Sequence, residues 1–423
     1  MRMAESSTRK VGRTHIEEDR ISVLPRNVQE TILCFMPIRD AVRTSILARN
    51  WRNCWTTIPN LVFDEDILSE KSRYIGRSRG LELAALNFVS VISNVLLLHN
   101  GPILRFSLCF PGFCDAKIIL DCFGQWIPLF SSKGIKQLYL EGLKNVWFPS
   151  TPAFGGLTFL KEIVLTDVST SEQNVFNCPV LEKLILFCCE GLLPINFRAP
   201  NLKYLRQMYT KMPSEYSLAG LKNIIEFSCM VACDREMPSE TSNVVKVFGC
   251  LNKIEKITIS TYFIAYLAAG GSPNKFPHPL HYLKTLTFTD IHLTRVSEVS
   301  CLLCMIRSAP NLSKLHILVD WLRKDAGEGN LNNYLVNVSE DCTIDQLEIV
   351  TICNLKGQRT ELDLIKYLLA RSPLLKTMYI NYSTSVLKKD AAAAMTKEML
   401  QYSKTSSGAQ IIHLKQIPFE LYY

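Results

Sequence analysis

The chain has 423 residues, of which 48% are hydrophobic and 20% charged, and its formal net charge is +8. This is the composition of a globular protein rather than a disordered one, with enough apolar material for a large core or an extended repeat array. The mild positive charge permits an acidic partner but does not require nucleic acid.

The fifteen cysteines have no regular spacing, and no apolar signal segment precedes them. We therefore expect a reducing compartment, the nucleus or the cytoplasm, in which most thiols are free and buried. The longest apolar stretch, Leu81–Leu98, is interrupted by polar residues such as Glu82 and Asn87, which favours an amphipathic helix over a membrane span. An extracellular repeat receptor is excluded on these grounds.

The segment 19–65 carries three short apolar patterns with helical spacing. In the first, Leu24, Val28 and Ile32 recur at steps of four, and Phe35 follows three residues later. Three such short helices cannot enclose the two tryptophans that follow. Another surface must therefore complete their core, either the rest of this chain or a partner.

The same segment contains a specific order of residues: a Leu-Pro pair at Leu24, a Met-Pro pair at Met36, the run Ala-Val-Arg-Thr-Ser from Ala41, and tryptophans at 51 and 55. This order resembles the F-box motif of plant proteins. One departure is the run 48–50, which reads Ala-Arg-Asn where the family carries a Ser-Lys-Arg type of sequence. The resemblance implies that this surface docks the Skp adaptor of a Skp–cullin–F-box ubiquitin ligase.

Positions carried over from that motif give the implied adaptor contacts. They are Leu24, Pro25, Val28, Ile32, Leu33, Pro37, Ala41, Val42, Leu47, Trp51 and Trp55. Some of these side chains must instead hold the helices together, and the sequence does not separate the two roles. We hypothesise that the adaptor largely holds the F-box folded; an isolated segment 15–66 that folds stably without it would contradict this.

From residue 103 onward a phrase recurs in which apolar residues occupy the first, fourth and sixth places, as in "ILRFSL" and "LKEIVL". Its first places are residues 103, 135, 160, 181, 202, 221, 254, 283, 312, 344 and 375. On a strand the fourth and sixth side chains share one face, which only stacked neighbours can bury. The irregular spacing, 19 to 33 residues, suits leucine-rich repeats. Gln207 and Glu226 interrupt the pattern, so either two repeats are distorted or the register is displaced by one residue.

A second recurrence aligns residues 304–317 with residues 367–380 at a constant offset of 63. Each segment reads as a helix end, a turn containing proline, and the strand phrase. The region around the second copy resembles the FBD region of plant F-box proteins: a strand, a Gly turn, an acidic-led helix and a closing strand. Leu362, Ile365 and Leu369 form the expected buried stripe of that helix.

We therefore predict an α/β chain in which a three-helix F-box precedes an irregular leucine-rich-repeat solenoid with a C-terminal FBD-type repeat region. The predicted parts are a disordered tail (1–18), the F-box (19–65), a helical linker (66–100), leucine-rich repeats (101–340) and an FBD-like region (341–423).

Residues between the buried positions of each phrase should face the concave side of the solenoid. These are Gln137, Tyr139, Glu162, Val164, Lys183, Ile185, Phe187, Lys256, Thr258, Thr285, Thr287, Lys314, His316, Gln346, Glu348, Thr377 and Tyr379. Among them we select as substrate-facing Tyr139, Lys183, Ile185, Phe187, Lys314, His316 and Tyr379. Their mixture of aromatic, aliphatic and charged groups suits a protein substrate and not a nucleic-acid groove. For any single residue, ordinary exposed surface is the alternative.

No motif in the sequence indicates catalysis or a cofactor. Cys301 and Cys304 form a lone C-x-x-C, and a zinc site would need two more ligands, so we expect buried thiols and no metal. We therefore predict a non-catalytic substrate receptor of a ubiquitin ligase that reaches a cullin through the Skp adaptor. A non-degradative interaction scaffold is the alternative, and an enzyme using one of the cysteines would need a nucleophile context that the sequence lacks.

Overall fold

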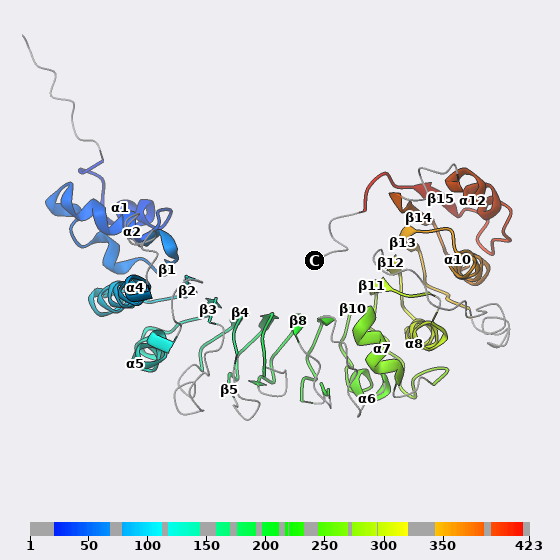
Figure 1. Ribbon diagram of the computed structural model, residues 1–423, viewed down its shortest axis with the longest axis horizontal. Helices are drawn as coiled ribbons and strands as arrows, with labels where there is room; N and C mark the ends of the chain where they lie inside the picture. Colours follow the sequence, from blue (N-terminus) through cyan, green and yellow to red (C-terminus); the bar gives the residue numbers. More distant parts are fainter. Residues whose placement is uncertain are drawn as a thin grey trace, which may run out of the picture.

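The curved sheet is the organising element of the molecule. The computed structural model describes residues 21–67, 78–111, 117–143, 158–169, 176–191, 197–210, 216–218, 220–231, 244–269, 273–293, 295–319, 343–384 and 391–417. Within these ranges thirteen parallel strands form one sheet that bends into an arc, with the strands on the inside and helices on the outside (Figure 1). This is the solenoid that the recurring phrase predicts.

Neighbours in the sheet follow the order of the chain. The strands are β1 (Asn60–Phe63), β2 (Arg105–Cys109), β3 (Gln137–Glu141), β4 (Glu162–Thr166), β6 (Lys183–Phe187), β8 (Tyr204–Thr210), β9 (Glu226–Val231), β10 (Lys256–Ser260), β11 (Thr285–Ile291), β12 (Lys314–Val319), β13 (Ile349–Leu355), β14 (Thr377–Tyr382) and β15 (Gln410–His413). Two short strands on the outer side, β5 (Phe176–Asn177) and β7 (Phe197–Arg198), pair with each other.

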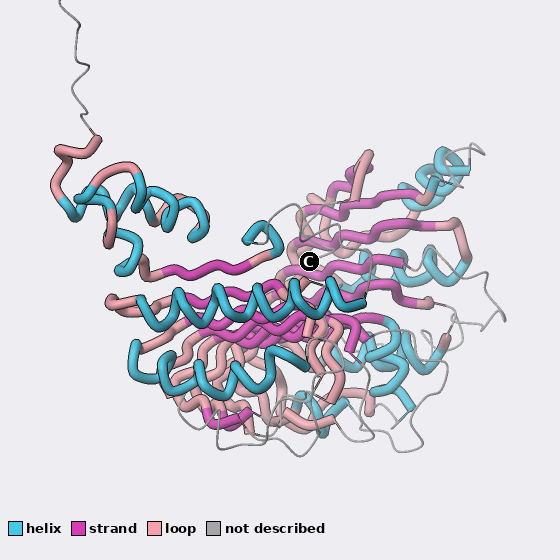
Figure 2. The backbone as a smooth tube through the Cα atoms, turned by 60° about the vertical axis from the view of Figure 1, so that its left-hand side comes forward, coloured by secondary structure: helices cyan, strands magenta, loops and turns pink. Residues whose placement is uncertain are grey.

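Helices cover the outer face of the sheet at both ends of the arc (Figures 1 and 2). The α-helices are α1 (Arg26–Leu33), α2 (Ile38–Arg43), α4 (Ser78–Leu98), α5 (Lys117–Lys133), α6 (Val244–Phe248), α7 (Thr261–Ala269), α8 (Val296–Arg307), α10 (Arg359–Arg371) and α12 (Ala391–Leu400). The helix expected over Leu81–Leu98 forms as α4. Among the described helices, none has the length and apolarity needed to cross a membrane.

The recurring phrase describes the buried face of the sheet. In β4, for example, Leu160, Ile163 and Leu165 occupy the first, fourth and sixth places and are all buried. The same three places are buried in the phrases that begin at 103, 135, 181, 202, 254, 283, 312 and 375, with Gln207 as the one polar residue among them. One continuous core therefore runs from the N-terminal helices to β15.

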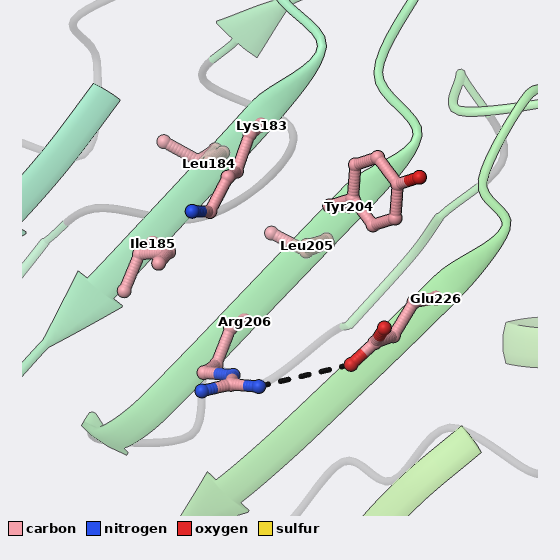
Figure 3. Close-up of a pocket in the computed structure, with 7 residues that line it drawn as sticks. All are labelled: Lys183, Leu184, Ile185, Tyr204, Leu205, Arg206 and Glu226. Carbon is pink, nitrogen blue, oxygen red and sulfur yellow. Dashed lines mark ion pairs between the residues drawn. The ribbon is translucent and has the colours of Figure 1, made fainter. Parts of the chain in front are cut away.

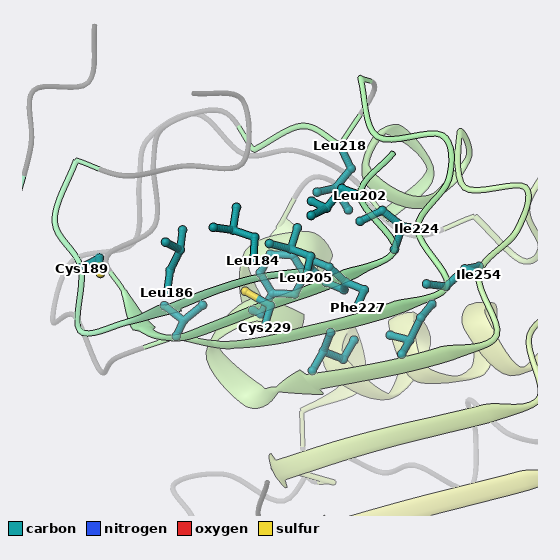
Figure 4. Packing of buried hydrophobic residues seen from close by; sticks show 14 of the residues in the cluster. Leu184, Leu186, Cys189, Leu202, Leu205, Leu218, Ile224, Phe227, Cys229 and Ile254 are labelled. Carbon is teal, nitrogen blue, oxygen red and sulfur yellow. The ribbon is translucent and has the colours of Figure 1, made fainter. Parts of the chain in front are cut away.

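Two of the predicted phrases have a different register. β9 pairs with β8 so that Phe227 lies beside Leu205, which makes Ile224 the first residue of that phrase and not Leu221 (Figure 4). The phrase placed at Ile344 likewise begins at Leu347. In both phrases the predicted start lies three residues too early, at an apolar residue of the turn that precedes the strand.

Gln207 is a true exception to the apolar pattern, and its register is correct. Its side chain is buried on the core side of β8 and accepts a hydrogen bond from the hydroxyl of Tyr216. The amide is thereby paired inside the core, so no distortion of the repeat is needed. Glu226, in contrast, is the first residue of β9 and faces the inside of the arc.

Three further elements differ from the sequence expectation. The third helical pattern forms as two 3₁₀ turns, η2 (Arg49–Trp51) and η3 (Cys54–Thr57). Residues 58–63 continue from them into β1, which repeats the phrase with Ile58, Leu61 and Phe63 buried and pairs with β2. At the other end β14 does not close the sheet, because β15 pairs with it.

A buried carboxylate recurs in two repeats at the same offset of 63 residues. Glu298, near the start of α8, is buried and accepts hydrogen bonds from the Thr261 hydroxyl and the His292 N–H. Glu361, which stands 63 residues later, is buried near the start of α10 and accepts backbone N–H bonds from Gly357 and Gln358. Each carboxylate ties a helix start to the turn that follows a strand.

A left-handed residue ends many of the strands. At the eighth place, counted from the first apolar residue of each phrase, φ is positive in Gly142, Asp167, Cys188, Tyr209, Asp290 and Asn354. In this conformation the N–H of Gly142 turns towards the next repeat and donates to the carbonyl of Thr166 at 3.0 Å. Glycine, Asn and Asp adopt it at low cost, whereas Cys188 and Tyr209 carry some strain.

The substitution Gly142→Ala tests the importance of this turn. A Cβ there would lie 2.5 Å from the carbonyl oxygen of Phe110 and would also require φ of +82°. We expect it to lower the free energy of unfolding by more than the ~1–2 kcal/mol of the left-handed conformation alone. Gly134→Ala, with positive φ but open space, should show only that smaller cost, and Gly220→Ala, with neither, almost none. Equal thermal midpoints for all three variants would contradict this account.

Candidate functional site

The N-terminal helices present an apolar surface to solvent. Phe35, Ile46 and Leu47 are 86%, 87% and 74% exposed, and Val28 and Ile32 on α1 are exposed as well. Large apolar side chains that gather on one surface in this way are typical of a docking site for another protein. The surface lies at the end of the arc where β1 joins the helices to the sheet (Figure 1).

The orientation of α1 explains this exposure. Its buried residues are Gln29 and Leu33, so the stripe formed by Val28, Ile32 and Phe35 points outward. Gln29 donates to the carbonyl of Ser22 at 3.2 Å and satisfies its amide inside the region. An ordinary amphipathic helix turns its apolar stripe inward, so the reversed arrangement makes this surface a candidate docking site.

The implied adaptor contacts separate into two groups. Leu33, Ala41, Trp51 and Trp55 are buried in the core of this chain. The others keep exposed or half-exposed surface: Leu24, Pro25, Val28, Ile32, Pro37, Val42 and Leu47. The first group holds the helices on the sheet, and only the second group presents surface for a contact.

The sequence prediction missed two of the most exposed apolar residues of this surface. Phe35 was recognised as part of the α1 stripe but not as a contact, and Ile46 is absent from the implied contacts. The signal for Phe35 was available, since it continues the stripe beyond Val28 and Ile32. Ile46 gave no such signal, because it lies on η1 (Thr44–Ile46), where helical spacing no longer applies.

Backbone hydrogen bonds fix the N-terminal helices to the sheet. The carbonyl of Thr56 accepts the N–H groups of Asn100 at 2.8 Å and Gly101 at 3.2 Å. His99 Nε2 lies 2.8 Å from the carbonyl oxygen of Ile58, and burial lowers the pKa of this histidine, which keeps it neutral. The docking surface and the sheet therefore belong to one rigid unit.

The inner face of the arc is lined by the third and fifth residues of each phrase. Its predicted residues Tyr139, Lys183, Ile185, His316 and Tyr379 occupy such places and are half-buried, and Lys314 is exposed. Phe187, in the seventh place, packs edge-on against Tyr209 with ring centroids 5.4 Å apart. Because the phrase at Leu347 was displaced, Gln346 and Glu348 do not occupy these places, which belong to Ile349 and Thr351.

The middle of the inner face is hollowed. A pocket of about 370 Å³ lies across β6, β8 and β9, with Lys183, Ile185, Tyr204, Arg206 and Glu226 around it (Figure 3). Lys183 pairs with Glu162 at 2.7 Å, and Arg206 lies 3.7 Å from Glu226. The pocket therefore combines apolar surface with balanced charges, which suits a peptide-like ligand.

Sequence reasoning found only part of this pocket. Lys183 and Ile185 were predicted, whereas Tyr204 and Arg206 were passed over because the irregular Gln207 made that repeat look distorted. Glu226 was read as a misplaced core residue. Tyr204 and Arg206 follow from the alternation of inward and outward side chains along β8, and Glu226 follows from it once β9 has its true register.

The buried thiols are poor candidates for nucleophiles. Burial raises the pKa of Cys178 and of Cys189 to about 12, and that of Cys304 to about 11. Such thiols stay protonated at neutral pH, and the thiolate is the reactive form. Cys301 and Cys304 are buried on α8, and within the described ranges no group of three His, Cys, Asp or Glu residues could hold a metal ion.

Known proteins resemble the chain along nearly all of its length. The F-box domain family model matches residues 21–63, and the FBD family model matches residues 341–380. The F-box/FBD/LRR-repeat protein At1g13570 of Arabidopsis thaliana is 31% identical over 94% of this chain and 99% of its own length. From the same plant, the F-box/LRR-repeat protein 13 is 24% identical over 94% of this chain and 97% of its own.

The two groups of N-terminal residues should differ in their effect on stability. Trp55→Ala opens a cavity in the continuous core and should destabilise the chain by about 3–5 kcal/mol. Phe35→Ala removes a side chain that is 86% exposed and should leave the thermal midpoint almost unchanged. Thermal unfolding of both variants checks this, and a large loss in Phe35→Ala would show that this ring has a structural role.

Proposed function

This chain belongs to the F-box/FBD/LRR-repeat family, and on that premise we propose that it is the substrate-recognition subunit of a Skp–cullin–F-box ubiquitin ligase. In this proposal the N-terminal apolar surface docks the Skp adaptor, and the inner face of the arc binds a protein substrate. The observation that carries the proposal is the outward-facing stripe Val28, Ile32 and Phe35, in a segment that matches the F-box domain model.

The separation of the two surfaces supports this division of roles. The docking surface lies beyond β1 at one end of the sheet, while the pocket around Lys183 and Arg206 lies on strands in its middle (Figure 1). An adaptor at the first surface leaves the second one open. Both partners can therefore bind the same chain at once.

The proposed contribution to ubiquitination is proximity. Binding both the ligase core and the substrate converts a dilute encounter between the substrate and a charged ubiquitin-conjugating enzyme into a reaction at high effective concentration. No residue of this chain has to act on the substrate chemically. The raised pKa values of Cys178 and Cys189, which burial causes, are consistent with a receptor that is not itself an enzyme.

The setting of the complex is also part of the proposal. We place it in the nucleus or the cytoplasm, with a cullin reached through the adaptor and with no direct role for nucleic acid or a membrane. The mixture of ion-paired charges and apolar side chains on the inner face, such as Lys183 with Glu162 beside Ile185, supports a protein substrate.

A non-degradative interaction scaffold is the alternative function. It is favoured by the departure from the family pattern at Ala48, Arg49 and Asn50, since Arg49 and Asn50 are exposed beside the docking surface. Asn50 donates its side-chain amide to the carbonyl of Ser22 and does not supply a charge. Co-purification of adaptor and cullin with this chain would support the ligase function. A folded chain that does not bind the adaptor would support the scaffold function.

Adaptor binding by the full-length chain is the first test of the proposed function. We expect the double variant Val28→Asp with Phe35→Asp to bind purified Skp adaptor at least about tenfold more weakly, because two charges would be buried in an apolar interface. Phe159→Asp, at an exposed Phe away from this surface, should bind normally. Failure of the unmutated, folded chain to bind would overturn the proposal.

Substrate capture should depend on the inner face alone. Lys183→Glu combined with Phe187→Ala is expected to reduce the proteins retained from a plant extract, while adaptor affinity stays unchanged. Lys397→Glu, an exposed lysine of α12 on the outer side, is the matched control. Mass spectrometry of the retained proteins gives the readout, and joint loss of adaptor and substrate binding would indicate misfolding instead.

A further inference from the structure

The inner face changes its chemistry from one half of the arc to the other. Around β4–β8 the fifth places carry Val164, Ile185 and Arg206. From β9 to β14 the register aligns a row of hydroxyl and imidazole side chains on six successive strands: Ser228, Thr258, Thr287, His316, Thr351 and Tyr379. Adjacent members stand roughly 4.8 Å apart, the spacing of paired strands.

Polar atoms in and beside this row have no hydrogen-bond partner. Nδ1 of His316 and Oγ1 of Thr289 are buried and unpaired in the structure, and Thr289 is only 3% exposed. Thr289 lies two residues beyond Thr287 on β11 and shares its face. Buried polar atoms are nearly always paired, so two unpaired ones on neighbouring strands of the inner face point to a ligand that pairs with them.

Positive charge is in excess at the same place. Lys256 and Lys314 occupy the third places of β10 and β12, on either side of Thr285. Glu226 is shared between Arg206 at 3.7 Å and Lys256 at 3.2 Å. Lys314 is exposed and makes no ion pair with any residue that the structure describes. The described inner face of β8–β12 therefore carries three cations and one carboxylate.

Burial and the excess of positive charge both contribute to a lowered pKa of His316. Burial, with help from the charges of Lys314 and Lys256, lowers the pKa of its imidazole to about 4. At neutral pH the ring is uncharged, so it adds hydrogen-bonding capacity without adding repulsion between the two ammonium groups.

The C-terminal segment borders this region. Leu414 donates its N–H to the carbonyl of Ile380 at 2.7 Å as the chain leaves β15. Ile417 then packs against Leu318 and Cys353 on β12 and β13. An apolar wall therefore stands beside the unpaired polar groups, and it limits the access of water to them.

We propose that Lys256, Lys314, Thr287 and His316 form a binding site for a phosphate dianion. The two lysines stand two strands apart, about 10 Å between their Cα atoms, and so reach a tetrahedral anion from opposite sides. The hydroxyl of Thr287 lies on β11, between the strands of the two lysines, and the imidazole of His316 lies two residues beyond Lys314 on β12. Both donate to the remaining oxygens of the anion. Lys183 offers no such site, because Glu162 neutralises it at 2.7 Å, whereas the Glu226 carboxylate that pairs with Lys256 is shared with Arg206.

The phosphate has two possible sources. It is either a free phosphate or a phosphorylated side chain of the protein substrate, and the second source rests on the proposed function. The shared chemistry is the dianion with its several acceptor oxygens, which distinguishes it from a singly charged carboxylate.

The first experiment measures the thermal midpoint of the full-length chain against inorganic phosphate, with chloride holding the ionic strength constant. We expect a saturable rise for the unmutated chain and at least tenfold weaker phosphate affinity for Lys314→Gln, whose exposed side chain should be dispensable for folding. Lys376→Gln, which alters an exposed lysine already paired with Glu348 at 2.8 Å, is the matched control. Equal responses of all three proteins would overturn the site.

A second experiment distinguishes free phosphate from a phosphorylated side chain of the substrate. Tighter binding of a short phosphoserine peptide than of inorganic phosphate, with no binding of its unphosphorylated form, would assign the site to a substrate side chain. Binding of inorganic phosphate alone would overturn the substrate-borne source. Adaptor affinity is measured on the same preparations. No phosphate binding with normal adaptor binding would overturn the site but not the proposed function. Phosphate binding without adaptor binding would overturn the proposed function but not the site.

Discussion

One backbone interaction sets the geometry of the entire arc. The carbonyl of the second residue in each phrase accepts two N–H groups, from the second and third residues of the next phrase. Leu104 accepts from Lys136 and Gln137, both at 2.9 Å, and the same pair of bonds recurs from Pro59 to Glu348. Because this bond pair fixes the register, it decides which side chains enter the core and which line the inner face.

Much of the fold followed from the apolar phrase, and the two register errors have one physical origin. The turn before many strands carries a small or apolar residue three places before the phrase begins, so Leu221 and Ile344 imitated the start of a strand. Asparagine would have given the correct register at Ile224: Asn201 and Asn311 precede true starts and donate to carbonyls of the preceding repeat, and Asn223 does the same before Ile224. β15 could not be found this way, since its pattern lacks the phrase.

The candidate site was less predictable, because an apolar stripe has the same spacing whether it faces the core or a partner. Only the structure shows that Gln29 enters the core while Val28 and Phe35 stay outside. The inner face was easier, since the alternation along each strand places its side chains once the register is known. Four members of the hydroxyl row, Thr258, Thr287, His316 and Tyr379, were expected on the concave side. Ser228 and Thr351 were missed with the displaced registers, and only the sheet aligns all six in one row.

The strand β1, which joins the N-terminal helices to the sheet, would fix where a bound substrate lies relative to a partner of those helices. Because the N-terminal helices and the sheet share one core in the part of the chain that the structure describes, the arc would act as a spacer of fixed length and direction. A substrate held near β6 and one held near β12 would lie at different, constant distances from the ligase core. The strand on which a substrate binds would then decide which of its lysines come within reach, so target-site choice would be a matter of position along the sheet.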